Sequence, residues 1–291
     1  MSTRKCLVCG KTQKKIFSKK KYSYYKCVEC GLVSTLPLPD KKTIIQHYRN
    51  NFNSGNYFSA REYSDYYMWI YNDFAEIILS ELRKHGIKSI KNFKVLDIGC
   101  FTGDFLSILK KKGAKVYGLE IQSEAVGIAK KKLKTKNIFI SPNDFKDSKG
   151  TFDLITLQGL IEHVEDPLEL IKFCSSQMKK GGFIMIQTPN AGSLFAHLLK
   201  RYWPPYAPVE HIHFFDRKGL NLLLENEGFE VTYYKNHWKK MPINYLYNNL
   251  HIFGKEWLPL INPFYKILPT FLKKQNVYFY VGEMIVMARK K

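Results

Sequence analysis

The stretch from residue 94 to residue 120, KVLDIGCFTGDFLSILKKKGAKVYGLE, constrains the fold more than any other part of the chain. A short apolar strand ends at Asp97, and a turn containing Gly99 and Gly103 follows it. An amphipathic helix then leads to a second strand, which ends at Glu120. Strand, glycine turn, helix and strand in this order predict the first βαβ unit of a parallel sheet that binds a nucleoside.

The residues of this unit indicate which nucleoside is bound. Only glycine removes the Cβ that keeps a ligand away from the backbone, and an acidic residue that ends the second strand can bind both hydroxyls of a ribose. The pattern is D-x-G-x-x-x-G rather than the G-x-G-x-x-G of dinucleotide folds, so Asp97 stands where a pyrophosphate would come close. A carboxylate there favours a cation. S-adenosylmethionine (SAM) carries an ammonium and a sulfonium and no phosphate.

At this unit the chain resembles the class I SAM-dependent methyltransferases, and the resemblance extends over about residues 60–235. It implies that Gly99 and Gly103 lie at the methionine end of SAM, that Asp97 lies near its amino group and that Glu120 binds its ribose. The family's third glycine is replaced by Phe101, whose side chain we expect to turn away from the ligand. Three further residues are predicted to bind the cofactor: Cys100, Ile121 and Gln158. By the same resemblance, Asp144 would bind the adenine amino group and Phe145 would flank its ring.

Apolar strands and amphipathic helices alternate from here to the end of the chain. Further strands are expected at 137–141, 152–157, 183–187, 230–234 and 277–288, and helices at 66–85, 123–133, 167–179 and 217–227. This alternation predicts an α/β fold with a doubly wound, Rossmann-like sheet covered by helices on both faces. The resemblance implies that its seven strands take the order 3-2-1-4-5-7-6, with strand 7 antiparallel.

Four of the six cysteines form two pairs near the N-terminus, with the spacing C-x2-C-x17-C-x2-C. They are Cys6, Cys9, Cys27 and Cys30, and a glycine follows each pair. Two such knuckles are typical of a tetrahedral zinc site, whereas disulfides are the less favoured interpretation for a cytosolic chain. Four thiolates leave no coordination position open, so the sequence predicts a structural Zn²⁺ in a zinc ribbon over residues 1–35.

Ligands of open α/β sheets bind beyond the carboxyl ends of the strands, so the loops after 152–157 and 183–187 are where we expect the chemistry. The first contains adjacent Glu162 and His163, which are catalytic candidates because histidine is the natural proton acceptor near neutral pH. The alternative is that both residues cap or pack the next helix. His211 is a third catalytic candidate, and strand alternation with His213 suggests that both imidazoles line the active site rather than bind a metal.

The segments CGLVSTLPLPD, DIGCFTGDFL, LIEHVEDP, GGFIMIQTPN and EHIHFFDRKGLNLLLENEGFEV resemble bacterial methyltransferases with an N-terminal zinc ribbon. Such enzymes often act in polysaccharide, sugar or natural-product biosynthesis. In the related nucleotide-sugar C-methyltransferases the Glu-His pair belongs to the active site, but their long extra C-terminal domain has no counterpart here, which argues against C-methylation. The resemblance therefore implies methyl transfer from SAM to a hydroxyl of a small-molecule or glycan/nucleotide-sugar acceptor.

Two alternatives stay open. The net charge of +21, with nine Lys or Arg and one Glu in residues 1–35, fits an RNA methyltransferase whose ribbon and basic surface hold nucleic acid. Against it, only seven of the 46 basic residues are arginine, and the N/D-P-P-Y/F motif of base N-methyltransferases is absent at 158–161. The other alternative is a non-catalytic SAM-binding protein, for which the bulky Phe101 is the supporting feature.

Residues 236–275 form an insertion between the last two expected strands, with six lysines and one acid. A substrate lid, a dimer surface, a membrane-interface patch and a packed helical pair all fit its basic and aromatic composition. We therefore expect a ribbon at 1–35, a linker and helical cap at 36–90, and a SAM-binding domain at 91–291. A signal peptide and a run of 18 apolar residues are both absent, so the expected location is the cytoplasm.

Overall fold

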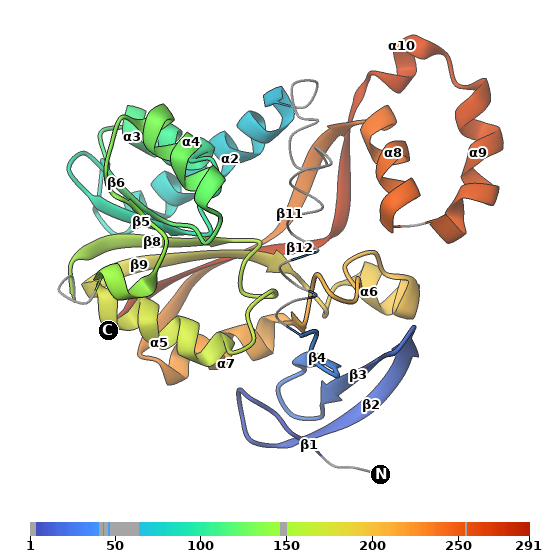
Figure 1. Ribbon diagram of the computed structural model, residues 1–291, viewed down its shortest axis with the longest axis horizontal. Coiled ribbons are helices and arrows are strands. Elements are labelled where there is room, and N and C mark those ends of the chain that lie inside the picture. The colour runs from blue at the N-terminus through green and yellow to red at the C-terminus, as the bar shows by residue number, and fades with distance from the viewer. Residues whose placement is uncertain (1–3, 41–42, 44–45, 47–63, 146–149, 254) are drawn as a thin grey trace.

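The computed structural model describes residues 4–40, 43, 46, 64–145, 150–253 and 255–291 of the chain. In these residues the strands form two sheets, one of seven strands and one of five. The large sheet lies between two layers of helices, and the small sheet lies beside them at the N-terminal end of the chain (Figure 1). Of the expected linker and cap, residues 36–90, the segments 41–42, 44–45 and 47–63 lie outside the described residues.

The elements of the large sheet lie close to their predicted positions. Its strands are β5 (Lys94–Ile98), β6 (Lys115–Leu119), β7 (Ile138–Phe139), β8 (Phe152–Gln158), β9 (Met178–Pro189), β11 (Phe229–Pro242) and β12 (Asn276–Lys290). Its main helices are α2 (Ser64–Lys84), α3 (Asp104–Lys111), α4 (Ser123–Leu133), α5 (Pro167–Gln177) and α7 (Arg217–Asn226). Shorter helical turns are η2 (Pro142–Phe145), α6 (Leu194–Leu199) and η3 (Lys200–Tyr202).

The strand order is β7-β6-β5-β8-β9-β12-β11, which confirms the predicted order 3-2-1-4-5-7-6. The strands from β5 to β9 are parallel, and β12 runs antiparallel to both of its neighbours, as expected. Helices α2, α3 and α4 cover one face, and α5 and α7 cover the other (Figure 1). The carboxyl ends of the parallel strands therefore meet at one edge of the sheet, where the connecting loops can form a site.

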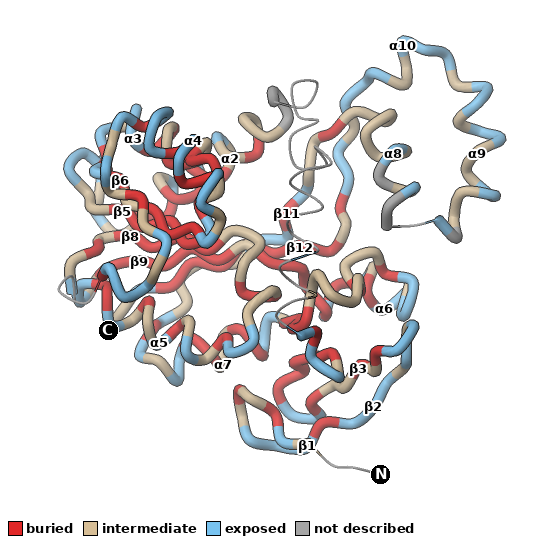
Figure 2. The backbone as a smooth tube through the Cα atoms, viewed as in Figure 1, coloured by how far each residue is buried: buried red, intermediate tan, exposed pale blue. Residues whose placement is uncertain are grey.

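The core lies on both faces of this sheet, and its central strands β5, β8 and β9 are buried along most of their length (Figure 2). Phe74, Phe105 and Leu109 belong to the cluster between the sheet and α2, α3 and α4. Ile171 and Leu220 belong to the cluster beneath α5 and α7. Because helices cover both faces, the central strands are almost continuously apolar rather than alternating, which is why they were recognisable in the sequence.

The expected insertion starts later than predicted. Residues 236–242 continue β11, because they pair with the start of β12 from Lys239–Phe279 to Pro242–Asn276. This pairing satisfies backbone groups that would otherwise face solvent in a loop. The segment between the two strands then forms α8 (Ile243–Phe253), η4 (Lys255–Trp257), α9 (Leu258–Ile267) and α10 (Thr270–Lys273). In the described part of the chain, no helix combines the length and apolar character needed to cross a bilayer.

The small sheet contains β1 (Arg4–Lys5), β2 (Thr12–Lys19), β3 (Tyr22–Cys27) and β4 (Val33–Leu36). Its fifth strand is β10 (His213–Phe214), which is far from the other four in sequence. It pairs with β4 in the register His213–Ser34 and Phe214–Val33. The backbone N–H of Thr35 also donates to the carbonyl of Ile212 at 2.9 Å. The N-terminal ribbon is therefore hydrogen-bonded to the rest of the molecule through a shared sheet.

The second cysteine knuckle also packs directly on the N-terminus of α7. Gly31 has φ 76°, and a Cβ built on it would lie 1.9 Å from Oδ2 of Asp216, the N-cap residue of α7. A Cβ on Gly219, in the first turn of α7, would lie 2.7 Å from the carbonyl oxygen of Cys30. Glycine at both positions lets the two backbones approach, so the ribbon and α7 form one packed unit.

Replacing Gly31 by alanine is expected to lower the free energy of unfolding more than replacing Gly10. Both glycines follow a cysteine pair and have left-handed φ values of 76° and 68°, so both variants incur backbone strain of about 1–3 kcal/mol. Only Gly31→Ala adds overlap with Asp216, because a Cβ on Gly10 would meet nothing within 4 Å. Urea unfolding followed by circular dichroism measures the difference, and equal losses in the two variants would contradict the contact with α7.

Candidate functional site

A cavity of about 830 Å³ opens at the carboxyl edge of β5, β6 and β8, within the range of about 300–1,000 Å³ that is usual for ligand pockets. Six of the predicted site residues line it: Gly99, Glu120, Ile121, Gln158, His163 and His211. Six others are not among its lining residues: Asp97, Cys100, Gly103, Asp144, Phe145 and Glu162. The cavity therefore extends from the end of the first βαβ unit to His163, which follows β8, and His211, which precedes β10.

Glu120 is held rigidly at the end of β6. Its Oε2 accepts a hydrogen bond from the backbone N–H of Phe101 at 3.0 Å, and its Oε1 accepts one from the N–H of Gln122 at 2.9 Å. The side chain is buried, and this burial raises the pKa of the carboxyl above its usual value. Each oxygen still has a lone pair for a further donor, as binding of two ribose hydroxyls would require.

Asp97 lies behind the wall of the cavity. Its Oδ1 accepts hydrogen bonds from the Thr156 hydroxyl at 2.6 Å and from Nε2 of Gln158 at 3.4 Å. Burial raises the pKa of Asp97 to about 7, and the nearby charge of Glu120 adds to this effect. Gln158 reaches the cavity, and its Oε1 is buried without a hydrogen-bond partner in the described residues. Asp97 and Gln158 thus offer negative charge and an unpaired acceptor, which fit a cationic ligand.

The residues of the glycine turn have different roles. A Cβ on Gly99 would point at the Leu160 side chain, 3.4 Å away on the cavity wall, and Gly99 has φ 78°. A Cβ on Gly103 would instead lie 2.9 Å from Cδ1 of Leu133, so Gly103 lets α3 and α4 pack closely. Cys100 is buried in the core, and its Sγ occupies the space beside Gly118. The structure therefore places only Gly99 of these three at the cavity.

Phe101 has φ 46° and is one of the residues that line the cavity. Asp144 is exposed in η2, where its Oδ2 accepts from the N–H of Ser141 at 3.3 Å. Phe145 is buried, with its ring centroid 4.8 Å from that of Phe139. The neighbouring Pro142 is the part of η2 that reaches the cavity wall.

Sequence reasoning missed part of the cavity wall. Tyr67, Met68 and Tyr71 of α2 line it, although the apolar periodicity of this helix indicated only core packing. Gln122 also lines it, and its Oε1 is buried without a partner in the described residues. The i, i+4 spacing of the two tyrosines was the available signal, but a helix stripe does not show which of its residues extend beyond the sheet edge.

The three predicted catalytic residues are brought together at the other end of the cavity. One ligand atom each from Glu162, His163 and His211 lies within 4.8 Å of the others. The two imidazole centroids are 4.7 Å apart at an interplanar angle of 68°, and Nε2 of His163 is 3.9 Å from Oε1 of Glu162. Glu162 is buried, and burial raises its pKa to about 6, an effect that the charge of His211 partly offsets.

Backbone carbonyls fix which nitrogen of each histidine carries the proton. Nδ1 of His163 lies 2.5 Å from the carbonyl oxygen of Glu210, and Nδ1 of His211 lies 2.8 Å from that of Pro205. A carbonyl only accepts, so both Nδ1 atoms must be the donors. In the neutral form of each ring, Nε2 then carries the lone pair, and it is the atom able to take up a proton.

Glu162 is anchored through its main chain and its side chain. Its carbonyl oxygen accepts from the N–H groups of Ile212 at 2.8 Å and His213 at 3.1 Å, and its Oε2 accepts from the Thr188 hydroxyl at 2.9 Å. Strand β4 of the ribbon pairs with β10, the strand that begins at His213. The ribbon therefore helps to hold Glu162 and also His211, which comes two residues before this strand.

His213 does not share the cavity with His211, contrary to the expectation from strand alternation. It is fully buried, its Nδ1 lies 3.1 Å from the Ser34 hydroxyl, and its Nε2 lies 3.2 Å from the carbonyl oxygen of Glu165. Burial lowers the pKa of His213 to about 4, so this imidazole is neutral at physiological pH. Alternation fails because β10 begins only at His213, so His211 precedes the strand.

The four N-terminal cysteines form the predicted cluster. The sulfur atoms of Cys6 and Cys30 are 3.5 Å apart, those of Cys9 and Cys27 are 3.4 Å apart, and all four lie within 4.8 Å of one another. Tetrahedral zinc with bonds of about 2.3 Å separates its sulfur ligands by about 3.8 Å, whereas a disulfide requires about 2.0 Å. All six cysteines are free thiols, so the geometry fits a structural Zn²⁺ held by four thiolates.

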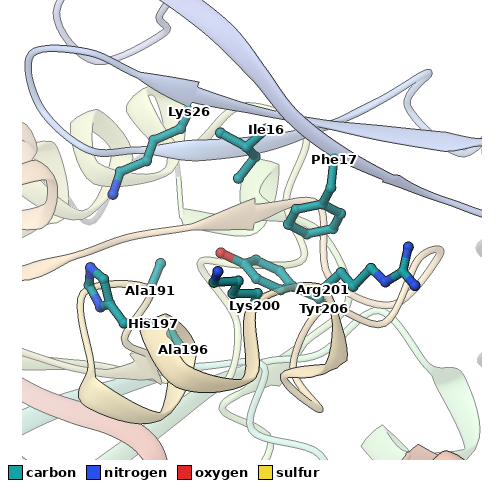
Figure 3. A pocket seen from close by; sticks show the side chains of 9 residues that line it. All are labelled: Ile16, Phe17, Lys26, Ala191, Ala196, His197, Lys200, Arg201 and Tyr206. Atoms are coloured by element: carbon teal, nitrogen blue, oxygen red, sulfur yellow. The ribbon is translucent and has the colours of Figure 1, made fainter.

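A second cavity, of about 350 Å³, lies between the ribbon and the segment containing α6 and η3 (Figure 3). Lys26 from β3 extends toward His197, and Lys200 and Tyr206 also line the cavity (Figure 3). Neither Asp nor Glu is among its described lining residues, and it shares none of them with the large cavity. Part of the positive charge of the chain therefore lies between the ribbon and α6, away from His163 and His211.

Solved structures with the same fold include a methyltransferase of Bacillus halodurans C-125 and the YcgJ protein of Bacillus subtilis. The first has a TM-score of 0.52 at 17% identity and covers 73% of this chain and 98% of its own. The second has a TM-score of 0.50 at 13% identity and covers 72% of this chain and 97% of its own. At these identities the likeness shows the fold.

Sequence relatives include the ubiquinone biosynthesis O-methyltransferases of Colwellia psychrerythraea and Vibrio parahaemolyticus. They are 32% identical over 127 residues and 34% identical over 103 residues. These alignments cover 40% and 33% of this chain, and 51% and 44% of the relatives, so the chain spans about half the length of the curated relatives it matches.

The family model described as a methyltransferase domain matches residues 54–234, more than half of the chain. This match contains the first βαβ unit, the cavity at its carboxyl edge and the Glu162, His163 and His211 cluster. The chain therefore belongs to the methyltransferase domain family and carries a four-cysteine ribbon at its N-terminus.

Proposed function

We propose that this enzyme methylates a hydroxyl group of a small-molecule acceptor and uses His163 as its general base. The observation that carries the proposal is that His163 and His211 line the same cavity as Glu120, with a carboxylate oxygen of Glu162 within 4.8 Å of a nitrogen of each imidazole. The names of the relatives, O-methyltransferases of ubiquinone biosynthesis, support a hydroxyl as the acceptor. A glycan or nucleotide-sugar acceptor is the finer possibility to be tested against other small molecules.

The cofactor end of the cavity is assigned to the residues around β5 and β6. Glu120 would hold the ribose hydroxyls, since both of its oxygens are fixed by backbone N–H groups. Asp97 and the unpaired Oε1 of Gln158 would attract the ammonium, because opposite charge and a free acceptor both favour a cation there. Bound SAM supplies an electrophilic methyl group on a sulfonium.

The acceptor end is assigned to the histidine pair. An acceptor hydroxyl is a weak nucleophile until its proton is removed, and Nε2 of His163 is the atom suited to receive that proton. Glu162 would stabilise the resulting imidazolium, because its buried carboxylate lies 3.9 Å from Nε2. His211, whose ring is inclined at 68° to that of His163, would orient the acceptor by hydrogen bonding. The in-line displacement requires that the cavity walls align the acceptor with the methyl donor.

Incubation with radiolabelled SAM tests the acceptor class. We expect label to enter one of several panels of small molecules, such as phenols, nucleotide sugars or hydroxylated glycans, and to be stable to mild base as an ether is. Total RNA is included because of the basic ribbon and the second cavity. Labelling of RNA alone, with binding that weakens steeply as salt rises, would replace the proposal by an RNA methyltransferase.

The affinity for SAM is expected to fall with decreasing pH below about 7. Burial raises the pKa of Asp97 to about 7, so at lower pH the carboxyl is neutral and a cationic ligand must first displace its proton. The expected slope is about tenfold in Kd per pH unit below the pKa. Calorimetry between pH 6 and about pH 8 measures it.

Asp97→Asn should weaken binding and abolish this slope, whereas the control Glu162→Gln, at the acceptor end, should keep it. A wild-type affinity that is constant over the same pH range would contradict the role of Asp97.

Replacing His163 by alanine should reduce kcat by about 10²–10⁴-fold, the usual contribution of a general base, and change the Kd for SAM by less than about twofold. Loss of the base affects only the step in which the acceptor loses its proton. His197→Ala is the matched control, because this histidine is outside the large cavity. Methyl transfer and SAM binding are measured on the same preparations, and unchanged turnover in His163→Ala would remove His163 from the mechanism.

A further inference from the structure

The helices between β11 and β12 form an arm, residues 243–275, that stands apart from both sheets (Figure 1). Strands β11 and β12 extend beyond the large sheet as an antiparallel pair and carry α8, α9 and α10 at their end. The described residues of α9 and α10 include no buried position. Neither helix is part of the SAM cavity, so the arm has no role in the chemistry described above.

A stripe of large apolar side chains runs along the outside of the arm. Leu260, Phe264, Ile267 and Phe271 follow the spacing i, i+4, i+7 and i+11, and their exposed fractions are 63%, 67%, 80% and 66%. The first three lie on one side of α9 because this spacing repeats on one helix face. Single exposed apolar residues are common on protein surfaces, but a continuous row of them marks an interaction site.

The opposite side of α9 is already used for packing against α8. The rings of Tyr247 and Tyr265 stack with their centroids 3.5 Å apart, and the Tyr247 hydroxyl donates to Oδ1 of Asn262 at 2.9 Å. On α8, Tyr245 and Leu246 pack against the core of the large domain. The arm is thus fixed on its inner side, and the stripe of Leu260, Phe264, Ile267 and Phe271 is its outer face.

Positive charge accompanies this stripe. Lys255, Lys266 and Lys274 are exposed, and the amine of Lys273 lies 4.7 Å from the ring centre of Tyr265. In the residues that the structure describes, none of these four lysines forms an ion pair with an acid. The sequence of the arm contains one acidic residue, Glu256. An apolar row with lysines beside it is the pattern of a helix that lies in a lipid interface.

We propose that the arm docks on an anionic membrane surface, with the apolar stripe among the acyl chains and the lysines at the lipid phosphates. Anionic headgroups supply the negative charge that the lysines lack, and the acyl region covers the apolar side chains. A second copy of the chain would cover the apolar residues but would bring the same positive charge against itself. Charge complementarity therefore selects the membrane as the occupant.

Co-sedimentation of the full-length enzyme with lipid vesicles tests the proposal. We expect binding to vesicles with about 30% phosphatidylglycerol to be at least about tenfold tighter than to pure phosphatidylcholine and to weaken as salt is added. Absence of binding to the anionic vesicles would overturn the proposal. A dimer in analytical ultracentrifugation that is dissociated by variants in the stripe, without vesicle binding, would instead assign the arm to a second copy and overturn it too.

Matched variants distinguish the effect of the stripe from that of other exposed apolar side chains, and the effect of the arm lysines from that of net charge. Phe264→Ser/Ile267→Ser/Phe271→Ser should weaken vesicle binding at least about tenfold, whereas Leu194→Ser/Leu198→Ser should not, although both of these leucines are 67% exposed on α6.

Lys266→Glu/Lys274→Glu should lose the preference for anionic lipid, and Lys130→Glu/Lys131→Glu on α4 should keep it at the same net charge. Circular dichroism and SAM binding confirm that each variant is folded. Equal effects of the arm variants and their controls would overturn the proposal.

Discussion

One pair of backbone hydrogen bonds connects the parts of this molecule: the carbonyl of Glu162 accepts from the N–H groups of Ile212 and His213. On its other side the same segment pairs with β4 of the cysteine ribbon. The ribbon therefore contributes, through β4, to holding the segment that contacts Glu162. The four cysteines that could hold a structural Zn²⁺ belong to this ribbon, so a bound metal would stabilise the element that pairs with the His211–His213 segment.

Buried carboxyl groups set the electrostatic character of the cavity. Burial raises the pKa of Asp97, Glu120 and Glu162, because a charge removed from water is poorly solvated. At one end this favours a cationic ligand, whose charge restores the ionised form of Asp97. At the other end it gives Glu162 a partner in the imidazolium that His163 would become. The same physical effect thus acts at both ends of one cavity.

Local pattern was sufficient for elements and motifs but not for the direction of side chains. The apolar runs at β5, β8 and β9 were recognisable because a parallel sheet is covered on both faces. Gly103 was expected at the methionine end of SAM, but it is not among the residues that line the cavity, and a Cβ on it would instead meet Leu133 of α4, 30 residues away in sequence. The pattern of alternation misplaced His213, because the length of β10 depends on its pairing with β4.

The sequence alone determined the order of strands and helices, the acids and glycines of the first βαβ unit and the four-cysteine cluster. These features are set by residues close together in the chain, where periodicity and spacing report conformation directly. Only the tertiary structure decided that Glu162, His163 and His211 meet, that the ribbon shares a strand with this cluster, and that the stripe on α9 lies on the outside. These contacts join segments far apart in the chain, whose relative positions are set by packing and sheet pairing rather than by local pattern.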